Sequence, residues 1–455
     1  MAKKLSIMDS GWLMMETRET PMHVGGLALF AIPEEAPADY MESIYRYLVD
    51  VEGICRPFNQ KIQSHLPLRM DAGWVEDTSF DIDYHVRHSA LPRPGRVREL
   101  LALVSRLHAQ RLDPSRPLWE SYLIEGLEGN RFALYTKMHH SMVDGVAGMY
   151  LMQSRLATSA QDRLPVPWSG KWEAGRKPRK SSGAPAVSGV SGMKNTVNNL
   201  RRGSGQLVDL LRQPRDGNVK TIYRAPKTQL NRRVTGARRF AAQSWSLPRI
   251  KAVAKQHGGT VNDIFLAMCG GALRRYLLSQ DSLPDDPLVA QVPVALRSAD
   301  QAADGGNAIT TVQVSLGTHI DDPQARLDAI QDSMKGVKSR LGDMQKAEID
   351  VYTLLTNVPL SLGQVTGLSG RVSPMFNLVI SNVPGPKETL YLNGAEMLAT
   401  YPVSLVLHGY ALNITVVSYK DSLEFGVIGC RDTLPHIQRF LDYFEASLAE
   451  LESQA

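Results

Sequence analysis

The stretch RFALYTKMHHSMVDGVAGMYLM, residues 131–152, runs from a strand pattern directly into a helix pattern. Apolar and polar residues alternate as far as the two histidines, and a run typical of a helix opens at Gly145. Successive side chains of a strand point to opposite faces of its sheet, so His139 and His140 are predicted to point in opposite directions. A side chain at such a strand-to-helix junction can be held rigidly at a cleft mouth. We therefore expect a mixed α/β fold with a functional group at this junction.

The two histidines and the acidic residue that follows them indicate proton-transfer chemistry. Imidazole is the side chain whose unperturbed pKa lies nearest neutrality, which suits His140 to remove a hydroxyl proton. Asp144 can fix the local turn or pair with a cation, and Gly145 permits a close approach that a side chain would block. A positioned base accelerates a reaction by about 10² to 10⁴. Substrate orientation and stabilisation of an oxyanion must supply the rest.

Two other interpretations of this motif stay open when it is taken alone. A His-His pair near an aspartate is common in cores and on surfaces without any catalytic role. Histidine and aspartate also ligate zinc, although the spacing here differs from the helical His-x3-His pattern and no cysteine supports a metal site.

Strand and helix patterns on either side of the motif predict two α/β halves joined by a linker. The N-terminal half covers residues 1–164, the linker residues 165–233, partly helical or disordered, and the C-terminal half residues 234–455. The linker is rich in Gly, Pro, Ser, Lys and Arg, which cannot form a core of their own. Two packed halves place the natural site between them. Strands are predicted at 23–32, 119–127, 131–140, 238–247, 286–296, 376–383, 404–420 and 422–430, and helices at 38–51, 96–112, 248–258, 261–280, 322–341, 345–356 and 434–451.

Composition and charge narrow the class of protein. The 455 residues are 43% hydrophobic and 21% charged with a net charge of +5, which is ordinary for a soluble globular protein. Three widely spaced cysteines favour a reducing compartment over a disulfide framework. The N-terminus lacks the apolar core of a signal peptide, and no stretch is long and apolar enough to span a bilayer. We expect a cytoplasmic protein, with any contact to the inner membrane face or to lipid inclusions made from the water side.

Several blocks of the sequence resemble one family. HHSMVDG matches the HHxxxDG signature of CoA-dependent acyltransferases, a superfamily that includes chloramphenicol acetyltransferases and peptide-synthetase condensation domains. The whole chain resembles the bacterial wax ester synthase/diacylglycerol acyltransferase family within it. The resemblance is carried by LSIMDSGWLMMETRETPMHVGGLALF, SRPLWESYLIEGLEGNRFALYTKMHHSMVDG, TVNDIFLAMCGGALRRYL, VPVALR and FNLVISNVPGP, which run in order along the chain outside the linker.

The resemblance implies a fold, a reaction and residue roles. The fold would be two chloramphenicol-acetyltransferase-like subdomains with a substrate channel between them. His140 would deprotonate an acceptor hydroxyl, whose oxygen attacks the thioester of acyl-CoA without an acyl-enzyme. His139 would support its geometry, and Asp144 would have a structural role with Arg297 as a candidate cationic partner. Acyl-CoA would be a co-substrate with no bound cofactor or metal, the acceptor a long-chain alcohol or diacylglycerol, and no nucleic acid is expected.

Three further blocks carry candidate site residues. Pro117, Leu118 and Trp119 match the family's PLW block and imply substrate binding, although a proline-started core strand explains them as well. Asn262 and Asp263 match its ND block, and Thr260 with Asp263 predicts a capping box for the following helix. Gly270-Gly271 in that helix would cost stability unless another helix or an acyl chain packs closely there. Residues 381–386 end a strand with a rigid turn, and a stop to the strand explains them. As a loop that lines the tunnel between the halves, they would instead make Asn382 a candidate donor near the thioester oxygen.

The family resemblance leaves rival functions to weigh. An acyltransferase of the same fold could act on an amine or on a non-lipid alcohol. A catalytically silent lipid-binding protein could share the fold, although the intact His140–Asp144 spacing counts against it. A metal hydrolase is the third possibility, and bound zinc would identify it.

Overall fold

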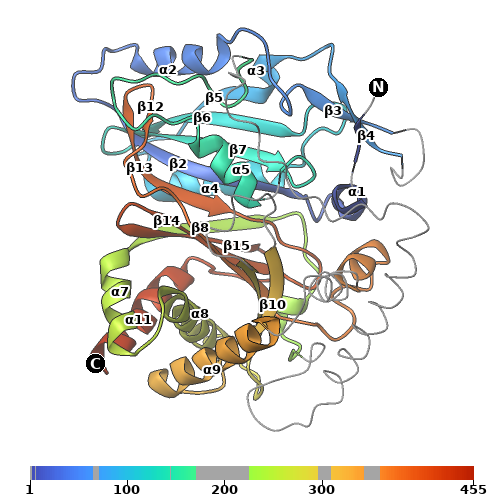
Figure 1. The fold of residues 1–455 in the computed structure, drawn as a ribbon, viewed down its shortest axis with the longest axis vertical. Helices are drawn as coiled ribbons and strands as arrows, with labels where there is room; N and C mark the ends of the chain where they lie inside the picture. The colour runs from blue at the N-terminus through green and yellow to red at the C-terminus, as the bar shows by residue number, and fades with distance from the viewer. Residues whose placement is uncertain are drawn as a thin grey trace.

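The computed structural model describes residues 3–5, 7–64, 71–143, 145–170, 225–295, 309–342 and 359–454. Asp144, Arg297, most of the predicted linker and the predicted helix at 345–356 lie outside these residues. Within them the chain forms two six-stranded sheets, one above the other in Figure 1, and a small three-stranded sheet. The mixed α/β fold expected from the sequence is confirmed.

The N-terminal sheet has the strand order β12-β13-β2-β7-β6-β5. Its central hairpin is formed by β6 and β7, which turn at Gly129 and Asn130, both with positive φ. Helix α2 covers its outer face, and α4 packs between this sheet and β8 of the second sheet (Figure 1). The bounds are β2 (His23–Ala31), α2 (Tyr40–Val49), β5 (Val86–Ala90), α4 (Val97–Ala109), β6 (Trp119–Leu127), β7 (Arg131–His139), β12 (Tyr391–Leu392) and β13 (Ala395–Val403).

The C-terminal sheet has the order β10-β9-β11-β14-β15-β8, and four helices lie on one side of it (Figure 1). Its interior joins the inner face of the N-terminal sheet in one large apolar core. That shared core holds the two halves together. The bounds are β8 (Arg238–Ser246), α7 (Leu247–Gln256), α8 (Val261–Leu278), β9 (Val289–Ala295), β10 (Ile309–Ser315), α9 (Pro323–Gly342), β11 (Leu378–Val383), β14 (Leu412–Tyr419), β15 (Ser422–Cys430) and α11 (Arg439–Ser453).

The two sheets do not divide the chain at one point. Strands β12 and β13 come late in the sequence, yet β13 pairs with β2 in the N-terminal sheet. Val166 and Trp168, at the start of the predicted linker, are buried in the N-terminal core. The predicted strand at 404–420 is therefore wrong in its first half, because the chain leaves β13 and turns through residues 404–411 before β14 begins in the other sheet.

Helix α8 begins and packs as its sequence predicts. Thr260 accepts a hydrogen bond from the backbone N–H of Asp263, and the Asp263 carboxylate accepts from the backbone and hydroxyl of Thr260 at 2.8 Å each, which confirms the capping box. A Cβ on Gly270 would lie 2.5 Å from the carbonyl oxygen of Leu316, and one on Gly271 would lie 2.4 Å from the Ser447 hydroxyl on α11. Neighbouring protein therefore occupies the space that these glycines leave open.

The remaining elements frame the first half of the chain. A short helix, α1, lies at the edge where the N-terminus enters, beside the small sheet of order β1-β4-β3 (Figure 1). Helix α5 follows the histidine motif. Their bounds are β1 (Lys3–Lys4), α1 (Ile7–Met15), β3 (Gln60–Gln63), β4 (Gly73–Glu76), α3 (Ile82–His85), α5 (Gly145–Gln153) and η2 (Gln229–Asn231).

Candidate active site

The two histidines lie where β7 ends, between the starts of its two neighbouring strands. The backbone N–H of His139 donates to the carbonyl of Leu118 at 2.9 Å, just before β6. The N–H of His140 donates to the carbonyl of Met22 at 2.8 Å, just before β2. The backbone of both residues is therefore hydrogen-bonded to either side, and the motif lies at the predicted strand-to-helix junction between β7 and α5.

His139 points into the protein and is fully buried. Its Nδ1 accepts a hydrogen bond from the backbone N–H of Ser141 at 3.1 Å and lies 2.7 Å from the Ser141 hydroxyl. Its Nε2 lies 3.7 Å from the carboxylate of Glu16. Because Nδ1 accepts from a backbone donor, the proton of a neutral ring is on Nε2, facing that carboxylate.

His140 is half-buried, and its ring stacks on the indole of Trp12. The ring centroids are 4.1 Å apart and the planes differ by 21°. Trp12 lies on α1, one helical turn before Glu16, which follows the end of that helix. Two residues on one face of this segment therefore contact the two histidines: Trp12 contacts His140, and Glu16 contacts His139.

Glu16 ties this segment to two more parts of the site. Its side chain is 4% exposed, accepts a hydrogen bond from the backbone N–H of Met22 at 3.2 Å, and pairs with Arg111 at 2.9 Å. A buried carboxylate needs such partners to remain charged. The result is a fixed loop between α1 and β2 beneath His139.

The PLW block packs beside the histidines. Leu118 is buried against Leu13 of α1, and Trp119 is fully buried, with its indole N–H donating to the carbonyl of Phe58 at 2.9 Å. Trp119 also stacks on Trp168, with centroids 5.0 Å apart. Pro117 is buried too. These placements explain the block through packing and through the Leu118 carbonyl, and direct contact with a substrate stays a prediction.

A set of ionisable side chains is buried behind the motif. His108 lies 2.6 Å from the Tyr135 hydroxyl through Nδ1 and 2.7 Å from the carbonyl of Ser404 through Nε2, and burial lowers its pKa to about 3. Burial and the neighbouring His108 lower the pKa of His23 well below its usual value. Both rings are therefore neutral at neutral pH.

A buried lysine completes this set. Lys137 donates to the last carbonyls of α4, at Leu107 and Gln110, and pairs with Glu120 at 3.2 Å. Burial lowers the pKa of Lys137, and the Glu120 carboxylate opposes that shift. A cation at a helix C-terminus is favourable, so this lysine ties β7 to α4.

Asn262 and Asn382 meet in a pocket of the C-terminal half. The Asn382 amide donates to the Asn262 side-chain oxygen at 3.4 Å, and both residues line a cavity of about 470 Å³. Its wall contains two exposed lysines, Lys251 of α7 and Lys338 of α9. The other lining residues are Leu247, Val261, Val292, Pro293, Val294, Met334, Pro384, Ser418 and Leu423.

The structure thus brings some of the predicted site residues together and leaves others apart. The two asparagines share a pocket, while Asp263, next to Asn262, is used in the cap of α8. His140 is not in the wall of this pocket. Gly145 is the first residue of α5, and the roles of Asp144 and Arg297 stay predictions because both lie outside the described residues.

Trp12, Glu16, Lys251 and Lys338 were not predicted from the sequence. Trp12 and Glu16 are four residues apart, the spacing that places two side chains on one helix face. That spacing was a usable signal, but nothing in it says which residues the helix face contacts. The two lysines lie on helices far apart in the sequence, so only the fold brings them together.

Two further properties concern the described ranges only. No group of three or more His, Cys, Asp or Glu side chains in them could hold a metal ion. None of the helices in these ranges combines the length and apolar composition that a membrane crossing requires.

Known protein families and relatives match this chain along almost its whole length. The wax ester synthase/diacylglycerol acyltransferase catalytic domain matches residues 5–265, and the C-terminal domain of the same family matches residues 305–452. A putative diacylglycerol O-acyltransferase of Mycobacterium tuberculosis is 45% identical over 453 residues, covering 98% of this chain and 99% of the relative. The O-acyltransferase WSD of Acinetobacter baylyi is 42% identical, with 99% and 97% covered.

Solved structures agree with these sequence matches. The wax ester synthase/diacylglycerol acyltransferase from Marinobacter aquaeolei VT8 superposes with a TM-score of 0.81 at 41% identity, covering 99% of each chain. The starter condensation domain of rhizomide synthetase, solved with C8-CoA and Leu-SNAC, has a TM-score of 0.57 at 12% identity, covering 99% of this chain and 94% of that one. At that identity the second match shows the fold alone.

Proposed function

Because the chain belongs to the wax ester synthase/diacylglycerol acyltransferase family, we propose that it moves a long-chain acyl group from acyl-CoA to a long-chain alcohol or to diacylglycerol. Its relatives are named O-acyltransferases, so the chain is an acyltransferase enzyme. The observation that carries the proposed mechanism is the half-buried ring of His140, fixed by backbone hydrogen bonds at the end of β7.

In the proposed reaction, His140 acts as the general base. Its imidazole takes the proton of the acceptor hydroxyl as that oxygen forms a bond to the thioester carbonyl carbon. The tetrahedral intermediate then breaks its carbon–sulfur bond, and the CoA sulfur leaves with the proton that the imidazolium returns. No acyl-enzyme forms, because the acceptor supplies the attacking oxygen.

The neighbours of His140 support this role. The indole of Trp12 presents its π face to the imidazole ring, which favours the cationic form that exists after proton transfer. His139, held between Ser141 and the Glu16 carboxylate, fixes the peptide that carries His140. His139 therefore acts as a positioning residue.

The lysine-lined pocket is the proposed entrance for acyl-CoA. Lys251 and Lys338 would meet the CoA phosphates, and the apolar wall would take the pantetheine arm. Asn382 would donate a hydrogen bond to the thioester oxygen as it becomes negative. A route from this pocket to His140 is part of the proposal.

The acceptors proposed here are lipids, so the enzyme must meet a lipid phase. A long-chain alcohol or diacylglycerol is held in a membrane or a lipid inclusion rather than in water. We propose peripheral contact with such a phase from the cytoplasmic side.

The test is a product assay on the purified full chain. Radiolabelled palmitoyl-CoA is supplied with hexadecanol, diacylglycerol, a long-chain amine and a short water-soluble alcohol, each dispersed in detergent, and the products are separated by thin-layer chromatography. Wax ester or triacylglycerol is expected. Labelled amide as the main product would instead support acyl transfer to nitrogen, and an absence of any acylated product would refute the proposed function.

A further inference from the structure

The segment at residues 359–372 buries two of its polar side chains and exposes four of its large apolar side chains. Gln364 and Ser369 are buried, with 8% and 7% of their surface exposed. Half of the eight exposed large apolar side chains in the described ranges lie in the same short segment. They are Leu362 (58% exposed), Val365 (46%), Leu368 (50%) and Val372 (55%).

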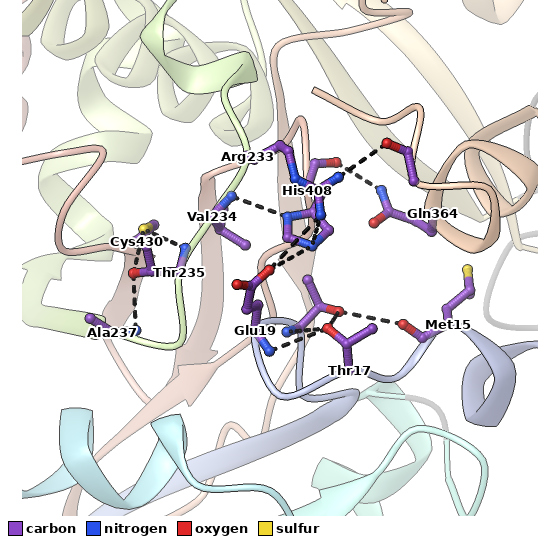
Figure 2. A network of polar contacts seen from close by, with 12 residues as sticks. Met15, Thr17, Glu19, Arg233, Val234, Thr235, Ala237, Gln364, His408 and Cys430 are labelled. Carbon is purple, nitrogen blue, oxygen red and sulfur yellow. Dashed lines mark hydrogen bonds and ion pairs between the residues drawn. The ribbon is translucent and has the colours of Figure 1, made fainter. Parts of the chain in front are cut away.

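Hydrogen bonds fix this reversed arrangement. The Gln364 amide donates to the carbonyl of His408 at 2.8 Å, as Figure 2 shows, and the backbone N–H of Ser369 donates to the carbonyl of Gly363 at 3.0 Å. The Gln364 hydrogen bond therefore holds the segment to the C-terminal half. The apolar side is left facing outward, where it costs free energy unless something covers it.

Cations surround the apolar side chains. Lys227 donates to the carbonyl of Arg371 at 3.3 Å, and Arg233 donates to the carbonyl of Gly367 at 3.1 Å, so the chain at 225–233 lies against the segment. Lys227, Arg232 and Arg371 are exposed. Neither 225–239 nor 359–376 contains an acidic residue. Glu19, whose side chain is 50% exposed, lies 3.9 Å from Arg233 and 3.3 Å from His408 (Figure 2).

The same segment continues inward toward the candidate base. Leu360, beside the exposed side chains, packs on an apolar cluster that contains Met375 and Phe376. Trp12 packs on that same cluster and also stacks on the ring of His140. The helical residues 359–365 and α1 lie near each other at one edge of the molecule in Figure 1. An unbroken series of apolar contacts therefore joins the surface to His140.

We propose that the apolar–basic patch, defined as Leu362, Val365, Leu368 and Val372 with Lys227, Arg232 and Arg371, docks onto an anionic phospholipid surface. The apolar side chains enter the interface while the cations meet the headgroups. The lipid acceptor then leaves that surface over the Met375–Phe376 cluster toward His140. This inference rests on the proposed function, because it supplies the route for a lipid acceptor.

Charge favours a lipid surface over a second copy of the chain. In a symmetric dimer through this patch the same surface would face itself, which places cations opposite cations. A phospholipid layer that contains phosphatidylglycerol instead neutralises all the cations of the apolar–basic patch. The pairing of exposed leucines with lysine and arginine, and without acidic residues, is typical of interfacial binding.

The experiment is flotation of the purified full chain with vesicles of phosphatidylcholine, alone or mixed with phosphatidylglycerol. The wild type is expected to float with the mixed vesicles and to be released by high salt. Leu362→Ser/Leu368→Ser should lower the partition coefficient on the order of tenfold. Lys227→Glu/Arg371→Glu should lower the partition coefficient on the mixed vesicles by about fivefold or more for each charge that is reversed.

Matched controls lie elsewhere on the surface. Leu278 and Leu398 are 48% and 42% exposed, so Leu278→Ser/Leu398→Ser removes similar apolar area outside the patch. Arg46→Glu/Arg98→Glu makes the same charge change at two exposed arginines, on α2 and α4. Both controls should bind vesicles like the wild type. Equal loss in controls and patch variants would overturn the proposal.

Activity separates this inference from the proposed function. The patch variants should transfer acyl groups normally to a detergent-dispersed alcohol and lose transfer to diacylglycerol presented in vesicles. Wild-type protein that is active in detergent but does not float overturns the docking surface alone. Protein that floats but acylates nothing overturns the proposed function. Patch variants that change oligomeric state, or that melt several degrees lower, would show that protein covers the patch. Either result would also overturn the proposed docking surface.

Discussion

The two halves of the molecule bury different kinds of polar side chain. The N-terminal half buries many ionisable groups near the motif, among them His23, His108, Glu120, Lys137 and His139. The buried polar groups of the C-terminal half are mostly amides and hydroxyls. Examples are Asn231, Gln291, Asn377, Asn413 and Thr415.

This difference separates two tasks of an acyl transfer. Moving a proton requires a group that can change its charge, and the N-terminal half holds such groups in fixed positions. Stabilising a developing oxyanion requires donors that keep the same protonation state, and amides such as Asn382 meet that need. We therefore assign proton transfer to the N-terminal half and neutral hydrogen-bond donation to the C-terminal half.

The largest effect in this comparison is expected at Asn382. Asn382→Ala should lower kcat by about 10² to 10³, the usual effect of removing an oxyanion donor, with little change in melting temperature. Asn262→Ala is the matched control, because it breaks the same 3.4 Å hydrogen bond but leaves the Asn382 amide in place. Equal losses in the two variants would mean that the pair only shapes the pocket.

A smaller effect is expected at Trp12. Trp12→Leu removes the aromatic face beneath His140, so the imidazolium loses a cation–π contact and kcat should fall by about 2- to 30-fold. The acid limb of the pH–rate profile should move to lower pH, because the neutral ring is then relatively favoured. Trp12→Phe should restore most of the lost kcat and return the acid limb most of the way to its wild-type position. A lower melting temperature without a shifted limb would leave Trp12 with a packing role only.

The third effect concerns stability in acid. Burial lowers the pKa of His108 to about 3, so the unfolded chain binds a proton at a higher pH than the folded chain does. The contribution of the neutral His108 ring to the free energy of unfolding is complete above the ordinary histidine pKa. It decreases as the pH falls from there toward 3. At pH 5 the loss is about 2 kcal/mol.

Urea unfolding between pH 7 and pH 4 measures this effect. His108→Gln should flatten the dependence of the unfolding free energy on pH, even where it lowers stability at pH 7. An unchanged slope in His108→Gln would show that other groups cause the acid sensitivity.

Local patterns predicted most of the described elements. The alternation in 119–127 and 131–139 gave two strands whose ends match the structure closely, and the Thr260–Asp263 spacing gave the cap of α8. The Gly270-Gly271 pair correctly indicated close packing, here against β10 and α11. These features depend on residues near one another in the sequence.

Features that depend on distant segments were not predictable in the same way. Nothing in residues 395–403 says that they pair with β2, some 370 positions earlier, so the predicted strand at 404–420 began too soon. The contact of Trp12 with His140 also joins segments far apart in the chain. The sequence identified the histidine motif, but the fold was needed to find what surrounds it.

The central claim is that the ring of His140 accepts the acceptor's proton. The most direct measurement is thiol release from palmitoyl-CoA with hexadecanol by His140→Ala, compared with wild type and with His88→Ala. The account predicts a fall of about 10² to 10⁴ in kcat for His140→Ala at an unchanged melting temperature, and wild-type turnover for His88→Ala. Turnover by His140→Ala within about twofold of wild type would contradict it.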